Sequence, residues 1–262
     1  MVRWLKISVL LMFCLTLSST RIDSSESDMA QLTAAGGAID EFDTLVLLPA
    51  QEDVPTRLII GDLRGFLHVF EQRSDAFEEV WTSGYFESAI GGLFVADIND
   101  DDLEELVVFT EKGRLHYLNL ETYSTQWSNP LNEYEHITSM TVHNVDEDEQ
   151  LELIFCADGR LIIYDTHHQF EEWASDLTNL DATELLVGDV DGDGADEIVL
   201  NTGYVFDANF HDLEWQSPES FGQRRSLLDL DNDGILELIG EFNGRFIKIF
   251  DIDLRREKST EP

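Results

Sequence analysis

The sequence predicts an all-β protein made of repeated four-stranded units, and three recurring features indicate this fold class. One motif of apolar, acidic and apolar residues occurs four times, as "LFVADINDDDLEELVVF" (93–109), "MTVHNVDEDEQLELIFC" (140–156), "LLVGDVDGDGADEIVLN" (185–201) and "LLDLDNDGILELIGE" (227–241). A glycine follows each motif at a nearly fixed distance, and a tryptophan recurs later in most units. Tandem repetition with a period of 20 to 50 residues is typical of solenoids and of propellers.

The spacing of the motif sets the boundaries of the units. Its first acidic-loop positions are separated by steps of 47, 45 and 40 residues and are Asp97, Asn144, Asp189 and Asp229. A fifth, degraded copy, "VLLPAQEDVPTRLIIG" (46–61), precedes them and keeps both apolar flanks without the acids. The glycines that follow the motif are Gly65, Gly113, Gly159, Gly203 and Gly244, and the tryptophans are Trp81, Trp127, Trp173 and Trp215.

Each unit is predicted to contain four short antiparallel strands. An apolar strand leads into the acidic loop, and a second apolar strand leaves it. A tight turn follows at the glycine, which adopts positive φ without a steric penalty. A third strand such as "RLHYLNL" and a fourth with the tryptophan complete the unit. Four-stranded repeats of this length predict a β-propeller of about five antiparallel blades, over residues 41–254.

The ends of the chain are expected to differ from the repeats. Arg3 and Lys6 precede the apolar stretch "ISVLLMFCLTL" and then small polar residues, so residues 1–20 resemble a secretory signal peptide. Eleven apolar residues are fewer than the roughly 20 that span a bilayer, which argues against a membrane anchor. Residues 21–40 form an N-terminal segment and residues 255–262 a polar tail. Because the fifth unit lacks a tryptophan strand, one hypothesis is that a strand between Asp28 and Asp40 completes it and closes the ring.

Composition limits the classes of function. The formal charge is -38, and removal of residues 1–20 makes it -40, because that segment holds two basic residues and no acid. Such a field repels nucleic acids and anionic membranes and attracts cations or basic partners. We expect a secreted, periplasmic or extracellular protein with no membrane span in the mature chain. Cys156 would be its only cysteine, so stability must come from packing or bound ions rather than from an internal disulfide.

The four acidic loops are the candidate functional sites. Counting the first position as 1, oxygen-bearing side chains occupy positions 1, 3, 5 and 9, and position 7 would contribute its backbone carbonyl. The candidate ligands are Asp97, Asn99, Asp101, Leu103 and Glu105; Asn144, Asp146, Asp148, Gln150 and Glu152; Asp189, Asp191, Asp193, Ala195 and Glu197; and Asp229, Asp231, Asp233, Ile235 and Glu237. Coordination by oxygen alone in a flexible loop favours Ca²⁺ over Mg²⁺. Up to four calcium ions are therefore predicted.

Two other interpretations of the loops compete with calcium binding. An EF-hand has a bidentate glutamate at position 12 and flanking helices, whereas position 12 from Asp189 is Leu200 and the flanks look like strands. Acidic turns exposed to solvent with no ion are common, but four copies in register argue against that interpretation. The Asp189 and Asp229 loops should bind most strongly, since each has four carboxylates and a glycine at position 6.

The degraded copy serves as an internal control. Pro49, Gln51, Asp53 and Arg57 occupy its positions 1, 3, 5 and 9. An arginine at position 9 places a permanent cation where the other copies have a ligand. We therefore expect no metal there and consider a pair between Arg57 and Asp53.

The acidic motif resembles the FG-GAP or VCBS repeat of integrin α-subunit propellers and of many exported bacterial proteins. "DVDGDGADEIV" and "DLDNDGILELI" match it well, and Phe221 and Gly222 resemble its leading Phe-Gly pair. "DINDDDLEELV" and "NVDEDEQLELI" match it more loosely, and no copy has the trailing Gly-Ala-Pro. The resemblance covers residues 45–250. It implies calcium-binding loops on one side of an integrin-like ring and partners on the other face or on loop insertions. Integrin-type rings have seven blades, whereas this sequence has five units.

No catalytic arrangement is recognisable in the sequence, which has no GxSxG, HExxH, CxxC or phosphate-binding glycine loop. We expect a non-enzymatic adhesion or binding scaffold that takes an unidentified protein or cell-surface ligand. A carbohydrate-binding propeller with a sugar pocket between blades is the first alternative. A calcium-dependent polysaccharide lyase or hydrolase is the second, and the negative charge disfavours it for anionic substrates. The recurring tryptophans are interpreted as packing anchors between sheets, with sugar stacking as the minor alternative.

Overall fold

The structure is a computed structural model, and it describes residues 41–51, 54–74, 76–145, 148 and 150–258, with the backbone of 33–34 and 37–38. The chain divides into two units, Met1–Gln31 and Leu32–Pro262, and all described residues belong to the second. The predicted signal peptide lies outside the described residues. In the part of the chain that is described, no helix has the length and apolar character needed to cross a membrane.

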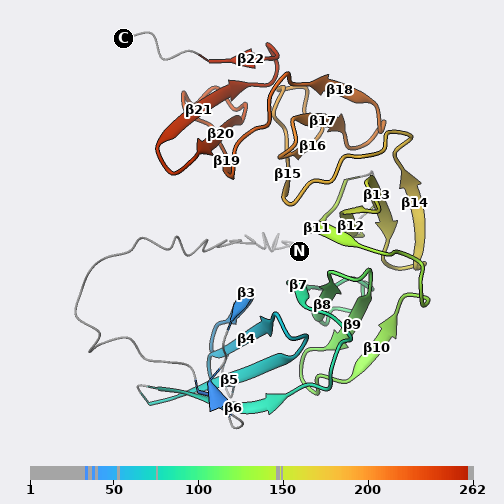
Figure 1. Ribbon diagram of the computed structural model, residues 1–262, viewed down its shortest axis with the longest axis vertical. Coiled ribbons are helices and arrows are strands. Elements are labelled where there is room, and N and C mark those ends of the chain that lie inside the picture. The colour runs from blue at the N-terminus through green and yellow to red at the C-terminus, as the bar shows by residue number, and fades with distance from the viewer. Residues whose placement is uncertain are drawn as a thin grey trace, which may run out of the picture. The chain divides into compact units, whose positions relative to one another are not determined.

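Five four-stranded antiparallel sheets follow one another in chain order, as Figure 1 shows. The first sheet contains β3 (Phe42–Leu48), β4 (Arg57–Asp62), β5 (Leu67–Arg73) and β6 (Ala76–Thr82). The second contains β7 (Ile90–Ala96), β8 (Glu105–Thr110), β9 (Leu115–Asn119) and β10 (Thr125–Ser128). The third contains β11 (Ile137–His143), β12 (Glu152–Ala157), β13 (Arg160–Asp165) and β14 (Phe170–Ala174).

The fourth sheet contains β15 (Leu185–Gly188), β16 (Glu197–Leu200), β17 (Tyr204–Asp207) and β18 (Leu213–Gln216). The fifth contains β19 (Arg224–Leu228), β20 (Glu237–Phe242), β21 (Phe246–Asp251) and β22 (Arg256–Glu257). First strands of successive sheets are in contact, from β3 and β7 through to β15 and β19. Five such sheets are the blades of a β-propeller, as the repeat predicts.

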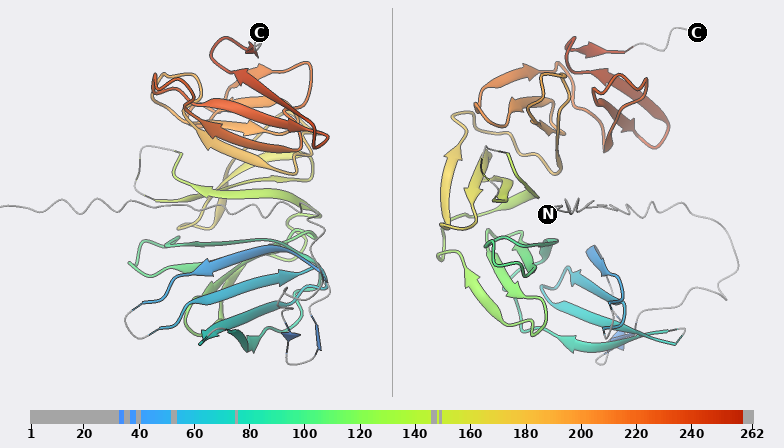
Figure 2. Two further views of the ribbon diagram at one scale, coloured as in Figure 1. Left: turned by 90° about the vertical axis from the view of Figure 1, so that its left-hand side faces the viewer. Right: turned by 180° about the vertical axis from the view of Figure 1, so that it is seen from behind.

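The buried hydrophobic side chains of the described residues form four clusters, each between two successive sheets. On β8, Leu106 and Val108 pack toward the first sheet, whereas Val107 and Phe109 pack toward the third. This alternation follows from the two-residue period of a strand. Both faces of an inner sheet are therefore buried, which explains why the second strands read as uninterrupted apolar runs. Figure 2 shows the stacking of the sheets from two further directions.

The repeat glycines and tryptophans take the places that the sequence predicts. All five glycines have positive φ, and a Cβ on Gly113 would lie 2.2 Å from the carbonyl oxygen of Tyr134. All four tryptophans lie on the fourth strand of their sheet. Trp81 packs against Tyr123 of the next sheet's outer hairpin with ring centroids 4.9 Å apart, and Trp173 stacks on His211 in the same way at 4.8 Å. These two tryptophans link neighbouring sheets.

The last sheet differs from the expectation at its outer edge. β22 pairs with β21, so the fourth strand of the fifth sheet comes from the segment that was expected to be a polar tail. The chain turns after Ile252, and the backbone N–H of Lys258 donates to the carbonyl of Ile249 at 2.7 Å. At the N-terminal end, β1 (Thr33–Ala34) pairs with β2 (Gly37–Ala38), and β1 lies beside β6 of the first sheet. These strands therefore do not supply the missing strand of the fifth sheet.

Candidate metal centre

Each acidic loop connects the first and second strands of its sheet, so the four loops occupy equivalent places in the second to fifth sheets. We name them by their first residue: the Asp97 loop (97–105), the Asn144 loop (144–152), the Asp189 loop (189–197) and the Asp229 loop (229–237). Position 9 is in each case the first residue of the second strand. Its backbone is fixed by the sheet, and this determines where its carboxylate lies.

The glutamate at position 9 is buried in all four loops and shapes each of them in the same way. Oε2 of this glutamate accepts the backbone N–H of position 2, at 3.3 Å from Ile98, 2.9 Å from Val145, 2.8 Å from Val190 and 2.9 Å from Leu230. The four glutamates, with exposed fractions between 0 and 6%, are Glu105, Glu152, Glu197 and Glu237. One oxygen of each buried carboxylate thus accepts a hydrogen bond from the backbone N–H of position 2. The hydrogen-bond partner of the other oxygen, Oε1, differs between the loops.

The carboxylates at position 5 also bond to backbone amides. Oδ1 of this residue accepts the N–H of position 7, in the pairs Asp101 with Leu103 at 2.9 Å, Asp148 with Gln150 at 2.6 Å, Asp193 with Ala195 at 2.8 Å and Asp233 with Ile235 at 2.9 Å. Such contacts between an Asp and the amide two residues later form Asx turns. Position 5 therefore curls the loop, and among the described residues it is outside the groups of side chains that converge.

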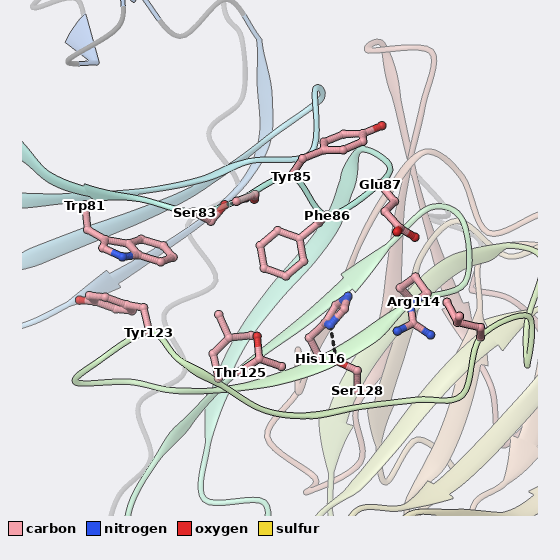
Figure 3. A pocket seen from close by; sticks show the side chains of 13 residues that line it. Trp81, Ser83, Tyr85, Phe86, Glu87, Arg114, His116, Tyr123, Thr125 and Ser128 are labelled. Carbon is pink, nitrogen blue, oxygen red and sulfur yellow. Dashed lines mark hydrogen bonds between the residues drawn. The ribbon is translucent and has the colours of Figure 1, made fainter.

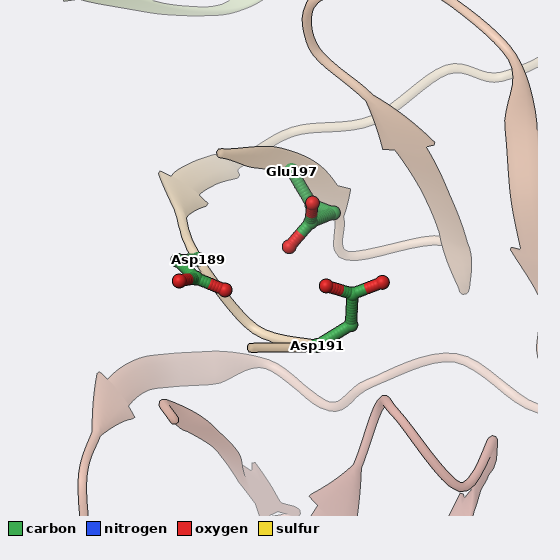
Figure 4. A group of neighbouring side chains, drawn as sticks. All are labelled: Asp189, Asp191 and Glu197. Carbon is green, nitrogen blue, oxygen red and sulfur yellow. The ribbon is translucent and has the colours of Figure 1, made fainter. Parts of the chain in front are cut away.

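In the Asp189 loop, the side chains of positions 1, 3 and 9 converge. Ligand oxygens of Asp189, Asp191 and Glu197 lie within 4.8 Å of one another. Figure 4 shows these three carboxylates directed toward a common centre. Glu197 is fully buried, and its Oε1 has no hydrogen-bond partner among the described residues. An unsatisfied carboxylate oxygen in such a place carries a full desolvation cost.

The electrostatics of the Asp189 loop favour binding of a cation. The pKa of Glu197 is raised to about 8, chiefly by burial and also by the neighbouring Asp191 and Asp189 carboxylates, while the hydrogen bond from Val190 opposes the rise. Burial and the nearby Asp193 also raise the pKa of Asp191. Like charges raise one another's pKa when nothing positive lies between them. A divalent cation with oxygen ligands would satisfy Oε1 of Glu197 and offset this repulsion, so these residues fit Ca²⁺.

The Asp229 loop has the same arrangement but holds a cation from the chain itself. Oxygens of Asp229, Asp231 and Glu237 also lie within 4.8 Å of one another. Nζ of Lys258 is 2.6 Å from Oε1 of Glu237 and 3.1 Å from Oδ2 of Asp231. The hydrogen bond from Lys258 lowers the pKa of Asp231, and these two contacts raise that of Lys258.

In the Asp97 loop an amide replaces the carboxylate at position 3. Nδ2 of Asn99 donates to Oε1 of Glu105 at 3.1 Å. In the Asn144 loop, Nδ2 of Asn144 donates to the carbonyl of Asp148 at 2.7 Å, and Asp146 lies outside the described residues. Within the described part of the chain, three converging carboxylates occur only in the Asp189 and Asp229 loops.

In the first sheet, Arg57 points to the second sheet. Its Nη1 donates to Oη of Tyr123 at 2.7 Å and to the carbonyl of Leu120 at 3.2 Å. The proposed partner Asp53 lies outside the described residues. Position 9 of the degraded copy thus makes a contact between sheets.

A cavity of about 320 Å³ lies between the first and second sheets (Figure 3). Its walls include the aromatic rings of Trp81, Phe86 and Tyr123. His116 packs edge-on against Phe86 with centroids 4.9 Å apart, and its Nδ1 lies 2.7 Å from Oγ of Ser128. Burial lowers the pKa of His116 to about 4, and its Nε2 has no described hydrogen-bond partner. The cavity was not identifiable from the sequence, because its walls come from two units.

The remaining histidines of interest make structural contacts. Nε2 of His143 lies 2.8 Å from Oδ2 of Asp196, which links the third sheet to the Asp189 loop. Nδ1 of His168 lies 2.9 Å from Oδ2 of Asp165, at the exposed β13–β14 turn. The buried His68 lies 2.7 Å from Glu79 and 3.5 Å from Asp62, a network that the sequence did not indicate.

Comparison with known proteins identifies the fold. No family model matches the chain, and no curated protein matches it by sequence. Among solved structures, BBS1N in complex with ARL6DN matches with a TM-score of 0.59 and 12% identity, over 82% of this chain and 66% of its own. Sqt1 of Saccharomyces cerevisiae matches with 0.58 and 12% identity, over 85% and 62%. BamB from Moraxella catarrhalis matches with 0.53 and 15% identity, over 84% and 64%.

These matched structures are β-propellers, and at such low identity the likeness establishes the fold alone. The chain spans less than two thirds of the length of each of these three structures. The chain is thus similar to propellers of otherwise unlike sequence.

Proposed function

We propose that this protein is an exported, calcium-binding β-propeller that acts as a non-enzymatic binding scaffold for a protein or surface partner. The observation that carries the proposal is the Asp189 loop, where the carboxylates of Asp189 and Asp191 converge with that of the buried Glu197, whose Oε1 has no hydrogen-bond partner among the described residues. The loop has the oxygen ligands that a hard cation prefers. The FG-GAP resemblance of the four motifs supports calcium as that cation.

The scaffold part of the proposal rests on fold and charge. Propellers present broad surfaces of loops, and the matched BBS1N structure is a complex with ARL6DN. In this chain the net charge of -38 favours a partner with a basic surface and disfavours nucleic acid. Export through residues 1–20 would place the loops in a calcium-rich medium, where weak sites fill.

Thermal unfolding tests the calcium site. An ion that binds only the folded state stabilises it by about 2.7 kcal/mol at 100 times its dissociation constant. We expect a higher Tm with Ca²⁺ than with chelator and little effect of Mg²⁺. The variant Glu197→Gln should lose most of the shift, whereas Asp176→Asn, which removes an exposed charge elsewhere, should keep it. An equal Tm with calcium and chelator would contradict the proposal.

Carbohydrate binding is the second candidate, and the cavity between the first two sheets favours it. Aromatic rings of Trp81, Phe86 and Tyr123 offer faces for a sugar, and Arg114 and His116 offer polar groups. A glycan array in calcium tests this candidate. Tyr85→Ala, which removes an exposed ring of the cavity wall, should weaken binding to a defined sugar, and Phe210→Ala, which removes an exposed ring outside the wall, should not.

A further inference from the structure

The position of Lys258 is determined by the edge of the fifth sheet. Lys258 directly follows β22, and its backbone N–H donates to the carbonyl of Ile249 at 2.7 Å. From there its side chain reaches the Asp229 loop, where Nζ lies 2.6 Å from Glu237 and 3.1 Å from Asp231. The ammonium thus contacts two of the three carboxylates that converge in this loop.

The Asp189 and Asp229 loops form a matched pair. Both have aspartates at positions 1, 3 and 5, a glutamate at position 9 and a glycine at position 6. In both, Oε2 of the glutamate accepts the N–H of position 2 at nearly the same distance. The difference lies at Oε1, which has no described partner in Glu197 and accepts from Lys258 in Glu237.

We propose that Lys258 is a built-in counter-ion that occupies the Asp229 loop and weakens divalent-cation binding there, leaving the Asp189 loop as the tight site. This inference rests on the proposed calcium function and concerns how calcium is divided between the two best loops. It also differs from the expectation that both loops bind strongly.

Competition follows from charge and geometry. A divalent ion between Asp231 and Glu237 would lie within a few ångströms of the ammonium, and like charges at that distance repel strongly in a partly buried place. The ion must therefore displace Lys258 before it can take Oε1 of Glu237. The lysine side chain is 38% exposed, so it can leave toward solvent, and the site is weakened rather than abolished.

Displacement of Lys258 would also affect β22, the edge strand of the fifth sheet. β22 is two residues long, and among the described strands it pairs with β21 alone. Lys258 anchors its C-terminal end to the loop, and the ion pair of Lys248 with Glu257, at 3.1 Å, remains when Lys258 leaves. Calcium at the Asp229 loop is therefore expected to loosen the last residues of the strand.

Calorimetric titration of the full-length protein with Ca²⁺ tests the inference. The wild type should bind one equivalent tightly, and Lys258→Gln should gain a second equivalent with at least tenfold higher affinity than the same site in the wild type. Lys248→Gln is the matched control, because it removes a neighbouring lysine that contacts Glu219 and Glu257 outside the loop. It should titrate like the wild type.

A second pair of variants assigns the sites. Glu197→Gln should lose the tight equivalent, and the double variant Glu197→Gln with Lys258→Gln should regain one, now at the Asp229 loop. Two equally tight equivalents in the wild type, unchanged by Lys258→Gln, would overturn this inference and leave the calcium function standing. Absence of binding in every variant would overturn both.

Discussion

Nη1 of Arg57 lies 2.7 Å from Oη of Tyr123 and so joins the first sheet to the outer hairpin of the second. Arg57 stands at the repeat position where the other four sheets have a buried glutamate. Its guanidinium carbon also lies 5.9 Å from the centroid of the Tyr123 ring, which in turn packs on Trp81. At this repeat position the first sheet therefore has an arginine that packs against the next sheet, whereas the other four sheets have a carboxylate.

Substitution of Arg57 or of Tyr123 should destabilise the fold, because each removes the hydrogen bond between these two side chains. Arg57→Met and Tyr123→Phe are each expected to lower the free energy of unfolding by about 0.5 to 1.5 kcal/mol, since a partly buried hydrogen bond is lost. In a double-mutant cycle by urea unfolding, the two effects should be less than additive by about 1 kcal/mol. Strictly additive effects would show that the contact contributes nothing to stability.

The partly buried His116 should make stability depend on pH. Burial lowers its pKa from 6.5 to about 4, so between these values the unfolded chain binds a proton at His116 that the folded chain does not. The contribution of His116 to stability is therefore complete above pH 6.5 and is lost as the pH falls toward 4, by up to about 3 kcal/mol.

Urea unfolding between pH 4 and 7 measures this effect as a difference between variants, which removes the background of the acids. His116→Gln should flatten the curve relative to the wild type, and substitution of the exposed His167 by Gln should not. Parallel curves for the wild type and His116→Gln would contradict the assignment.

The turn glycines should differ from other glycines in their tolerance of a side chain. Gly113 has φ of 76°, and an added Cβ would lie 2.2 Å from the carbonyl oxygen of Tyr134. Gly113→Ala is expected to cost at least about 2 kcal/mol, from the left-handed backbone and the clash together. Gly84→Ala meets no atom within 4 Å and should change stability by less than about 0.5 kcal/mol. Equal Tm values for the two variants would contradict this account of the turn.

The sequence predicted the order of strands because each unit repeats the same local signals. Apolar runs on both sides of an acidic loop, a glycine at the next turn and a tryptophan on the last strand are all local features, and each one occurs where it was expected. The edge strand β22 was missed because "RREKSTEP" has no apolar pattern, and its pairing depends on a turn that returns the chain to β21.

The sequence predicted where the candidate loops lie, but it did not predict how the loops differ as cation sites. Composition made the Asp189 and Asp229 loops equivalent, and only the structure shows that Lys258, 21 residues after Glu237, reaches into one of them. The local pattern also does not reveal that the position 5 aspartates bond to backbone amides instead of joining the converging group. The first difference depends on a contact that is distant in sequence, whereas the second depends on a bond between residues only two positions apart.

Anomalous diffraction from crystals grown with calcium, then exchanged to a lanthanide, tests the central claim most directly. We expect an anomalous peak among the oxygens of Asp189, Asp191 and Glu197, and a weaker one or none beside Lys258 in the Asp229 loop. A structure with these three carboxylates directed away from one another and no peak at the Asp189 loop would contradict that claim.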